Sequence, residues 1–395
     1  MESLFCCYSN KPERKETKSN FQINNDKNKD KSDYYNIENS NFIYFNNYNL
    51  YKPQKYYYTN TSYGKIEDFE KTHIGFQNIG NSCYMNSFLQ ILFHCPGFIN
   101  KLKKEYGLLF DEPCLVKSLI DLSECPNNIN CLKDIQKYMS EAYSEYYLSR
   151  QNDSQDFGKD LINQVIKSIK GDGDEDEYSY YESENEYENN NIISDEQKII
   201  KYKNYINKFN KDEIFIETIF ELIESEERIT SRGSNIIFNT SLYIELFFPK
   251  NNKVSYTLDN LLNFKYSNNS EKDEYIEKKK GIKVIRKICR LPKILILNIN
   301  RAIYGYHLIN SKLNIPETLN LSNYIDNSII EKNECTKYNL FAINEKVGHT
   351  KSNGHYFCYI NIENSWYLFD DSYVIKTNPY FNSENVVGLF YIKKE

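Results

Sequence analysis

The hydrophobic and polar positions of this chain follow different periods in its two halves. Between residues 83 and 168, apolar side chains recur every three or four positions, beginning with Met85, Phe88, Leu89, Leu92 and Phe93. This spacing places them on one face of a helix. The same period returns at Leu115, Leu119 and Leu122, and again at Phe157, Leu161, Ile162, Val165 and Ile166. We therefore expect the first part of the chain to be helical.

The second part changes to strand-like patterns. Short runs rich in β-branched and aromatic residues occupy 236–238, 241–248 and 294–299, and similar runs continue to the end of the chain. Such runs are typical of β-strands. Helices followed by strands, without strict alternation, predict an α+β fold with a helical first part and an antiparallel β second part.

Two stretches lack either period. Residues 1–71 are a low-complexity segment rich in Asn, Lys, Tyr and Ser, which we expect to be mostly disordered. At about 170–198 lies an acidic insertion, in which nine Asp and Glu residues fall between Asp172 and Glu188. Runs of one charge are usually solvated loops, so we expect disorder here too. One large domain, 72–395, remains.

Composition argues against some classes of function. A net charge of −6 argues against a general nucleic-acid binder. No apolar run approaches the roughly 18 residues of a transmembrane helix. The ten cysteines are scattered and no secretory signal pattern precedes them, which predicts reduced thiols in the cytoplasm or nucleus. We expect no cofactor.

The most informative stretch runs from Gly75 to Asn86, with the sequence GFQNIGNSCYMN. A turn of Gly80, Asn81 and Ser82 precedes the first predicted helix, and Asn and Ser are favoured helix caps. Cys83 therefore falls at a helix N-terminus, where the helix dipole and free N–H groups favour a thiolate. A thiolate is a nucleophile, so Cys83 is a candidate catalytic residue.

A candidate base lies near the C-terminus. His355 begins one predicted strand, and a second predicted strand ends in Asp370 and Asp371. A hairpin between these strands would bring Asp370 beside His355. A carboxylate in that position holds the imidazole so that its other nitrogen can accept the thiol proton. The chain has only five histidines, which limits the choice of base.

These motifs resemble the cysteine and histidine boxes of the ubiquitin-specific proteases. The cysteine box matches G-L-x-N-L-G-N-T-C-Y-M-N-S-x-L-Q with conservative changes at Phe76, Ile79 and Ser82. Further matching blocks follow in order at 151–157, 291–301, 312–324 and 389–391. The resemblance runs from about residue 72 to the C-terminus. It implies a papain-like fold of thumb, fingers and palm, and a Cys-His-Asp deubiquitinase that forms a thioester with ubiquitin.

The resemblance also implies roles for individual residues. Cys83 would be the nucleophile, His355 the base and Asp370 its orienting partner, while Asp371 would support them. Asn78 would donate a hydrogen bond to the oxyanion of the reaction, together with the backbone N–H of Cys83.

A second set of residues would bind substrate. The ubiquitin tail carries two arginines before its terminal Gly-Gly, and carboxylates bind guanidinium groups bidentately. The resemblance assigns this contact to Asp153 and Asp156, with Gln151 beside them, and places Tyr356 along the channel over the Gly-Gly. The simpler alternative is that Asp153 and Asp156 only complement a helix N-terminus.

Two departures from the family pattern affect substrate fit. Ala302 replaces the usual Phe after Arg301, unless Ile303 or Tyr304 fills that place. Lys351 stands where a Gly usually follows the His at 349. Two other classes stay open. One is a peptidase for a ubiquitin-like modifier, since such relatives share the same boxes, and the other is a catalytically silent ubiquitin-binding scaffold, against which the intact Cys83, His355 and Asp370 argue.

The predicted fingers lack the residues for a zinc ribbon. Residues 214–287 contain no Cys or His, although a closed structural zinc site needs four such ligands. We therefore expect no metal, and fingers held by strand pairing and by the apolar residues Ile236, Phe238, Leu242 and Ile244.

Overall fold

The computed structural model describes residues 73–109, 112–147, 150–171, 192–209, 213–231, 233–249, 253–266, 282–302, 308–348 and 353–394, all within one compact unit of the chain. The predicted disordered segment 1–71 and most of the predicted acidic insertion lie outside these residues. None of the helices in these ranges combines the length and apolar character that a bilayer crossing requires.

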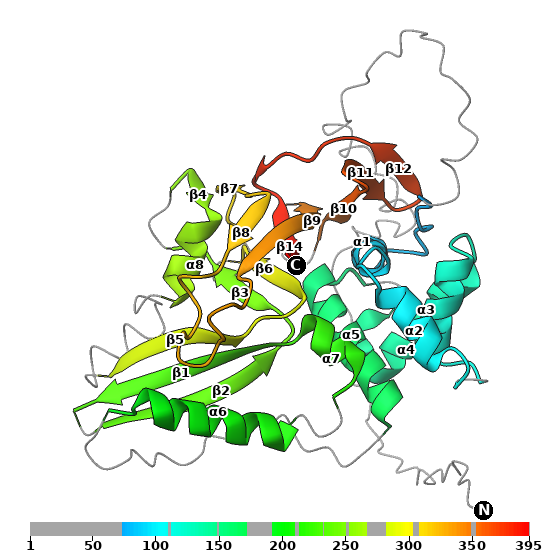
Figure 1. The fold of residues 1–395 in the computed structure, drawn as a ribbon. Coiled ribbons are helices and arrows are strands. Elements are labelled where there is room, and N and C mark those ends of the chain that lie inside the picture. The colour runs from blue at the N-terminus through cyan, green and yellow to red at the C-terminus, as the bar shows by residue number, and fades with distance from the viewer. Residues whose placement is uncertain are drawn as a thin grey trace, which may run out of the picture. The chain divides into compact units, whose positions relative to one another are not determined.

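The first part of the described chain is helical, as predicted. Its helices are α1 (Cys83–Phe93), α2 (Phe98–Tyr106), α3 (Leu115–Glu124), α4 (Ile129–Ala142) and α5 (Ser154–Lys170), with a 3-10 turn at Ser144–Tyr146. The short helix α7 (Phe215–Phe220) comes later in the chain and contacts α5 (Figure 1).

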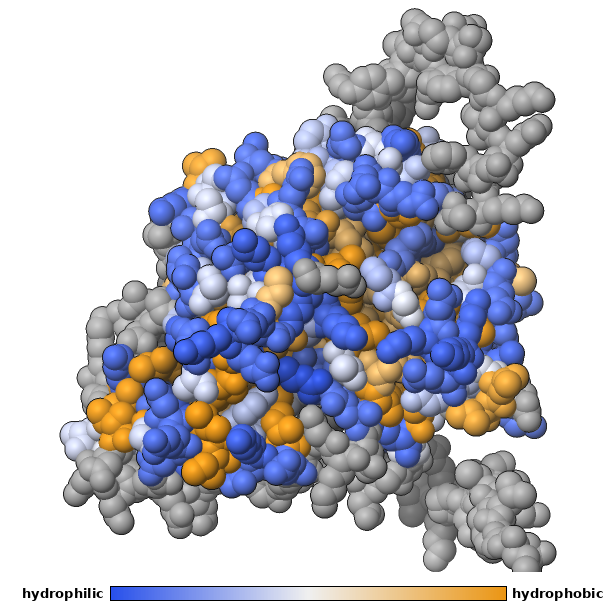
Figure 2. All heavy atoms as spheres, in the orientation of Figure 1, coloured by the Kyte–Doolittle hydropathy of each residue, from blue (hydrophilic) through white to orange (hydrophobic). Residues whose placement is uncertain are grey.

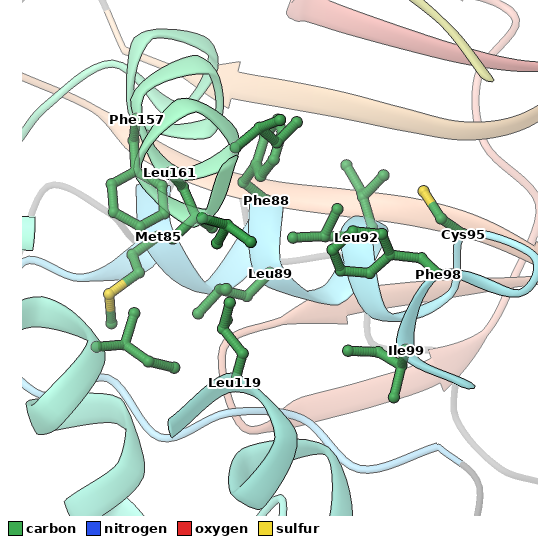
Figure 3. Packing of buried hydrophobic residues seen from close by; sticks show 14 of the residues in the cluster. Met85, Phe88, Leu89, Leu92, Cys95, Phe98, Ile99, Leu119, Phe157 and Leu161 are labelled. Carbon is green, nitrogen blue, oxygen red and sulfur yellow. The ribbon is translucent and has the colours of Figure 1, made fainter. Parts of the chain in front are cut away.

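The apolar face predicted for α1 is buried. Met85, Phe88, Leu89 and Leu92 are each at most 2% exposed. They pack between α3, α5 and the start of α2 (Figure 3). Gly158 lets α5 come close, because a Cβ atom there would lie 2.0 Å from the Phe88 ring. This core fixes the helix that carries Cys83.

A large sheet forms the second part of the fold. In the described residues it contains eight strands, and the main path runs β12 (Tyr373–Lys376), β11 (Ser365–Asp370), β10 (His355–Ile362), β9 (Lys337–Val347), β14 (Val386–Lys393), β6 (Ile294–Asn300) and β3 (Ile244–Phe247). β8 (Thr318–Asn320) also pairs with β9. Neighbouring strands are antiparallel except β3 and β6, which are parallel.

Strand β6 shows how the sheet divides two cores. Ile294 and Ile296 belong to the core shared with the helices, whereas Leu295 and Leu297 belong to a second core on the opposite face. Burial on both faces explains the uninterrupted apolar run in the sequence. The second core is completed by α8 (Leu258–Tyr266) and by a small sheet of β4 (Ser255–Thr257), β7 (Lys312–Asn314) and β13 (Asn382–Ser383).

A separate three-stranded sheet extends from this body. It consists of β2 (Gly233–Ser241), β1 (Leu222–Thr230) and β5 (Lys283–Arg290), in that order and antiparallel. Helix α6 (Asp195–Phe209) lies along β2 (Figure 1). Tyr202 and Tyr205 contact the ring of Phe238, and Lys198 pairs with the buried Glu227 at 2.9 Å.

The structure corrects two predictions in this region. The acidic insertion does not continue as a loop to 198, because α6 begins at Asp195 and the backbone N–H of Ile193 donates to Ser234 Oγ at 2.8 Å. Ile236 and Phe238 lie in β2 as predicted, but Leu242 and Ile244 do not hold this sheet. Leu242 is buried in the helix-side core, and Ile244 lies in β3 of the large sheet. The bend after Ser241 redirects the chain between the two sheets.

The surface seen in Figure 2 is mostly hydrophilic. Hydrophobic residues gather more densely at the lower left, over the end occupied by the three-stranded sheet and α6.

Candidate active site

Cys83 is the first residue of α1, at the end of a tight turn. Gly80 and Asn81 have φ angles of 114° and 52°, a region that favours Gly and Asn. Ser82 occupies the N-cap position but does not cap the helix with its side chain, contrary to the sequence prediction. Its hydroxyl instead accepts the N–H of Ile79 at 2.9 Å. The side chain of Cys83 is buried, with 2% of the residue exposed.

Asn78 organises the same turn. Its Oδ1 atom accepts the backbone N–H of Gly80 at 3.0 Å and of Ser82 at 3.3 Å. Its Nδ2 atom is left as a donor and hydrogen-bonds Asp371 Oδ2 at 2.9 Å. An amide nitrogen carries two hydrogens. One of them is therefore held by Asp371, while the other can serve a ligand.

The hairpin predicted near the C-terminus is present. β10 begins at His355, β11 ends at Asp370, and the two strands pair in antiparallel register. His355 Nε2 lies 2.5 Å from Asp370 Oδ1. This contact fixes the imidazole ring and leaves Nδ1 for another partner. Helix α1 contacts both strands, which brings Cys83 to the hairpin (Figure 1).

The pKa of the His355 imidazole is shifted by its burial and by the side chains next to it. Burial lowers the pKa of the imidazole, but the hydrogen bond and charge of Asp370, together with the neighbouring Cys83, raise the pKa to about 10. His355 therefore stays protonated near neutral pH. An imidazole beside a cysteine can exchange a proton with the thiol, and the thiolate is the reactive form of such a nucleophile.

Asp371 does not face His355 in the way Asp370 does. Its two oxygens accept the side-chain amides of Asn78 and Asn86, at 2.9 and 2.8 Å. The sequence interpretation gave the side chain of Asn86 no role. The available signal was an amide inside the apolar face of α1, where a polar side chain needs a hydrogen-bonding partner.

Of the four residues predicted to bind substrate, Asp153 and Tyr356 are joined by a hydrogen bond, and Gln151 bonds the backbone just before the base. Gln151 Oε1 accepts the backbone N–H of Gly354 at 2.9 Å, next to the base. Asp153 caps α5, with Oδ1 accepting the N–H of Gln155 at 2.8 Å. Tyr356 is buried, with 2% exposed, and its hydroxyl donates to Asp153 Oδ2 at 3.3 Å. The Tyr356 ring is therefore a support behind Asp153 and not an exposed wall of the groove.

A groove lies between the start of α5 and the ends of the sheet strands. Its lining includes Asp153 and the exposed Asp156 at the start of α5, together with Glu245 and Glu384. Lys346 also contributes, with its ammonium group 5.1 Å from the centre of the Tyr356 ring. Carboxylates thus outnumber the cations, which favours a basic peptide segment as the occupant.

One of the two departures noted in the sequence, Ala302, lies in the lining of this groove. Ala302 pairs with Leu308, and both line the groove, so a small and an aliphatic side chain stand where the family has an aromatic one. Arg301 is 4% exposed and donates to backbone oxygens of Val386, Ile309 and Ser311 at 2.7 to 2.9 Å. Residues 303, 304, 349 and 351 lie outside the described part of the chain.

Three side chains that could ligate a metal lie close together in the described residues. Within the described ranges, His355, Asp370 and Asp371 are the set of three possible ligands whose atoms lie within 4.8 Å of one another. Their nitrogen and oxygen atoms already pair with each other and with Asn78 and Asn86. This arrangement suits proton transfer better than a resident cation.

Comparisons with known sequences match one family across this domain. The family model described as ubiquitin carboxyl-terminal hydrolase matches residues 74–391. Ubiquitin carboxyl-terminal hydrolase 4 of Arabidopsis thaliana is 24% identical over 335 residues, covering 76% of this chain and 84% of that protein. Hydrolase 25 of the same plant is 24% identical over 354 residues, covering 80% of this chain but only 47% of its own length.

Solved structures show the same fold. The Ubp8 chain of a SAGA DUB module bound to ubiquitin aldehyde is similar with a TM-score of 0.62 and 18% identity, covering 82% of this chain and 70% of that one. The same module bound to monoubiquitin gives a TM-score of 0.61. The helical part is accordingly the thumb, the eight-stranded sheet the palm, and the three-stranded sheet the fingers.

Proposed function

This chain belongs to the ubiquitin carboxyl-terminal hydrolase family, and on that basis we propose that it is a deubiquitinase with Cys83 as its nucleophile. It hydrolyses the peptide or isopeptide bond after the C-terminal glycine of ubiquitin. The observation that carries the assignment of residues is the position of His355, which hydrogen-bonds Asp370 on the hairpin that packs against α1, the helix that Cys83 begins.

The chemistry follows from those contacts. The Cys83 thiolate attacks the carbonyl carbon of the terminal glycine, and the negative charge moves to the carbonyl oxygen. The backbone N–H at Cys83 and the second Nδ2 hydrogen of Asn78 stabilise that oxyanion. The His355 imidazolium then gives its proton to the departing amine, the C–N bond breaks, and a thioester remains.

Hydrolysis of the thioester returns the site to its starting state. His355, now neutral, takes a proton from water as the water attacks the thioester carbonyl. The C–S bond breaks, ubiquitin leaves with a free carboxylate, and the thiolate–imidazolium pair re-forms. Asp370 keeps the imidazole in one orientation through both steps.

The groove supports a basic, extended substrate tail. Asp153 and Asp156 stand at its thumb side, where they can accept hydrogen bonds from the arginines of the ubiquitin tail. Gln151 supports the backbone just before the base. The proposed partners are ubiquitin and ubiquitinated proteins, without nucleic acid or a cofactor, in the cytoplasm or nucleus.

Ubiquitin with a C-terminal electrophile tests this proposal. The wild-type protein should form a covalent adduct at Cys83, identified by peptide mass spectrometry, and should release a fluorophore from ubiquitin. Cys83→Ala should abolish both reactions while still binding ubiquitin, and Cys125→Ala, which changes an exposed cysteine of the thumb, should change neither. Turnover by Cys83→Ala would show that the nucleophile is wrong.

Two controls separate the alternatives. The same electrophile on other Gly-Gly modifiers should react more slowly, and a preference for one of them would make this protein a peptidase for that modifier. Ubiquitin binding without adduct formation would make it a silent scaffold.

A further inference from the structure

The main chain after Asp370 is in an unusual conformation. Asp371 leads from β11 toward β12 with a φ angle of 51°, in the left-handed region that non-glycine residues rarely adopt. Such a conformation persists where surrounding contacts hold it, and it is found preferentially at functional sites.

All of these contacts reach the segment that carries the nucleophile. Asp371 Oδ1 accepts Nδ2 of Asn86 at 2.8 Å, and Oδ2 accepts Nδ2 of Asn78 at 2.9 Å. Asn86 lies in the first turn of α1 and is 2% exposed. The same Nδ2 atom also lies 3.4 and 3.3 Å from the carbonyl oxygens of Phe76 and Gln77.

Gly75 brings the two main chains into contact beside these hydrogen bonds. A Cβ atom at Gly75 would lie 2.3 Å from the carbonyl oxygen of Asp371 and 2.6 Å from the carbonyl carbon of Ser372. Both are backbone atoms, which cannot move aside as the end of a flexible side chain could. Only glycine fits this position without displacing the Asp371 turn.

We propose that Asn86, Asp371 and Gly75 form a latch that fixes the position of Cys83 relative to His355. Cys83 is carried by α1 of the thumb, and His355 and Asp370 are carried by β10 and β11 of the palm. Asp371 follows Asp370 directly, and Asn86 follows Cys83 by one helical turn. The latch thus joins the two halves of the catalytic centre next to the reacting atoms. Asn86 is a positioning residue in this arrangement, and its effect on turnover rests on the proposed function.

The loss in reaction rate that we expect follows from the geometry of proton transfer. A misplacement of about 1 Å between reacting groups can cost roughly 100-fold in rate. Loosening the latch should therefore weaken the pairing of Cys83 with His355 without removing either group.

Asn86→Ala and Gly75→Ala test the latch from its two sides. The first removes the donor to Asp371, and the second pushes the Asp371 turn away. Gln90→Ala is the matched control, because Gln90 is a buried amide one turn further along α1 that donates to the backbone of Ile74 at 2.8 Å and not to Asp371. Asp371→Asn serves as a second, isosteric variant if either alanine variant fails to fold.

The primary measurement is the rate of Cys83 alkylation by iodoacetamide as a function of pH, followed on the Cys83 peptide. This reaction forms no oxyanion, so it reports the Cys83–His355 pair and is independent of the donor role of Asn78. The wild type and Gln90→Ala should give the same rate profile. In Asn86→Ala and Gly75→Ala, the alkylation rate near neutral pH should fall relative to that of Gln90→Ala.

Turnover of a ubiquitin–fluorophore substrate is the second measurement. Asn86→Ala should lower kcat by about 10- to 100-fold and leave KM nearly unchanged. An alkylation profile of Asn86→Ala identical to that of Gln90→Ala would overturn the latch. Wild-type protein with a reactive Cys83 but no ubiquitin turnover would instead overturn the proposed function, and the alkylation comparison would still decide the latch.

Discussion

The hydroxyl of Tyr356 donates a hydrogen bond to Asp153 Oδ2 at 3.3 Å, which ties the residue after the base to the first turn of α5. This contact crosses from palm to thumb behind the substrate groove. Asp153 is thus held by Tyr356 on one oxygen and by the backbone of α5 on the other. Its position is fixed before any substrate arrives, which lowers the entropy cost of binding a basic side chain.

Removing only the charge of Asp153 should weaken substrate capture. Asp153→Asn keeps an oxygen for the helix cap, so α5 should stay intact. A hydrogen bond to a charged group contributes about 1.5–3 kcal/mol, so KM should rise by roughly 10- to 100-fold with a smaller change in kcat. Steady-state kinetics on a ubiquitin substrate measure this. Asp134→Asn on α4, an exposed residue outside the groove lining, removes the same charge and should leave KM unchanged.

Asn78→Ala should act mainly on the chemical step. Loss of one oxyanion donor typically lowers kcat by about 10²–10³, whereas KM should change little. Because Asn78 Oδ1 also holds the turn before Cys83, the melting temperature has to be measured alongside. A rise in KM with normal kcat would identify Asn78 as a binding residue.

The raised pKa of His355 predicts a pH-dependent contribution to stability. The folded pKa of about 10 lies above the ordinary value of 6.5, so protonation of His355 stabilises the folded state. That contribution is fully present below about pH 6.5 and is lost as the pH rises through 10. Urea unfolding of wild type and Asp370→Asn should therefore differ most near pH 6 and converge toward pH 10. A difference that grows with pH would contradict the assignment.

Deleting residues 172–191 should leave activity on a minimal ubiquitin substrate nearly unchanged. This cut ends before Ile193, whose N–H bonds Ser234, and before α6. A longer deletion through Gln197 removes that link and the first turn of α6, so it should lower the melting temperature. Loss of activity in the shorter deletion alone would place the acidic stretch in the substrate site.

The purified protein should contain far less than about one zinc per chain, the least that a closed structural site would hold. The fingers are formed by the β2–β1–β5 ladder, with Phe238 packed against α6. A chelator should therefore change neither turnover nor melting temperature. Stoichiometric zinc whose removal unfolds the domain would refute this account of the fingers.

Local patterns in the sequence determined the elements that carry the chemistry. The apolar period after Cys83 predicted α1, and the strand patterns at His355 and before Asp370 predicted their hairpin. These signals are reliable because the residues that make each element are close in the chain. Helix α6 was not predicted from the sequence. Its first turn contains Asp195 and Glu196, which resemble the acidic insertion before them, and the helix is stabilised by packing against β2.

The tertiary structure alone decided how the two halves of the site meet. Asn86 and Asp371 are 285 positions apart, and no local pattern indicates that their side chains bond. The contact of Gly75 with the Asp371 backbone is equally distant in sequence. Hydrogen bonds and close backbone approaches act over a few ångströms in space, whereas periodicity reports only neighbours along the chain. The sequence therefore determined which groups are present, and the packing of α1 against β10 and β11 determined their geometry.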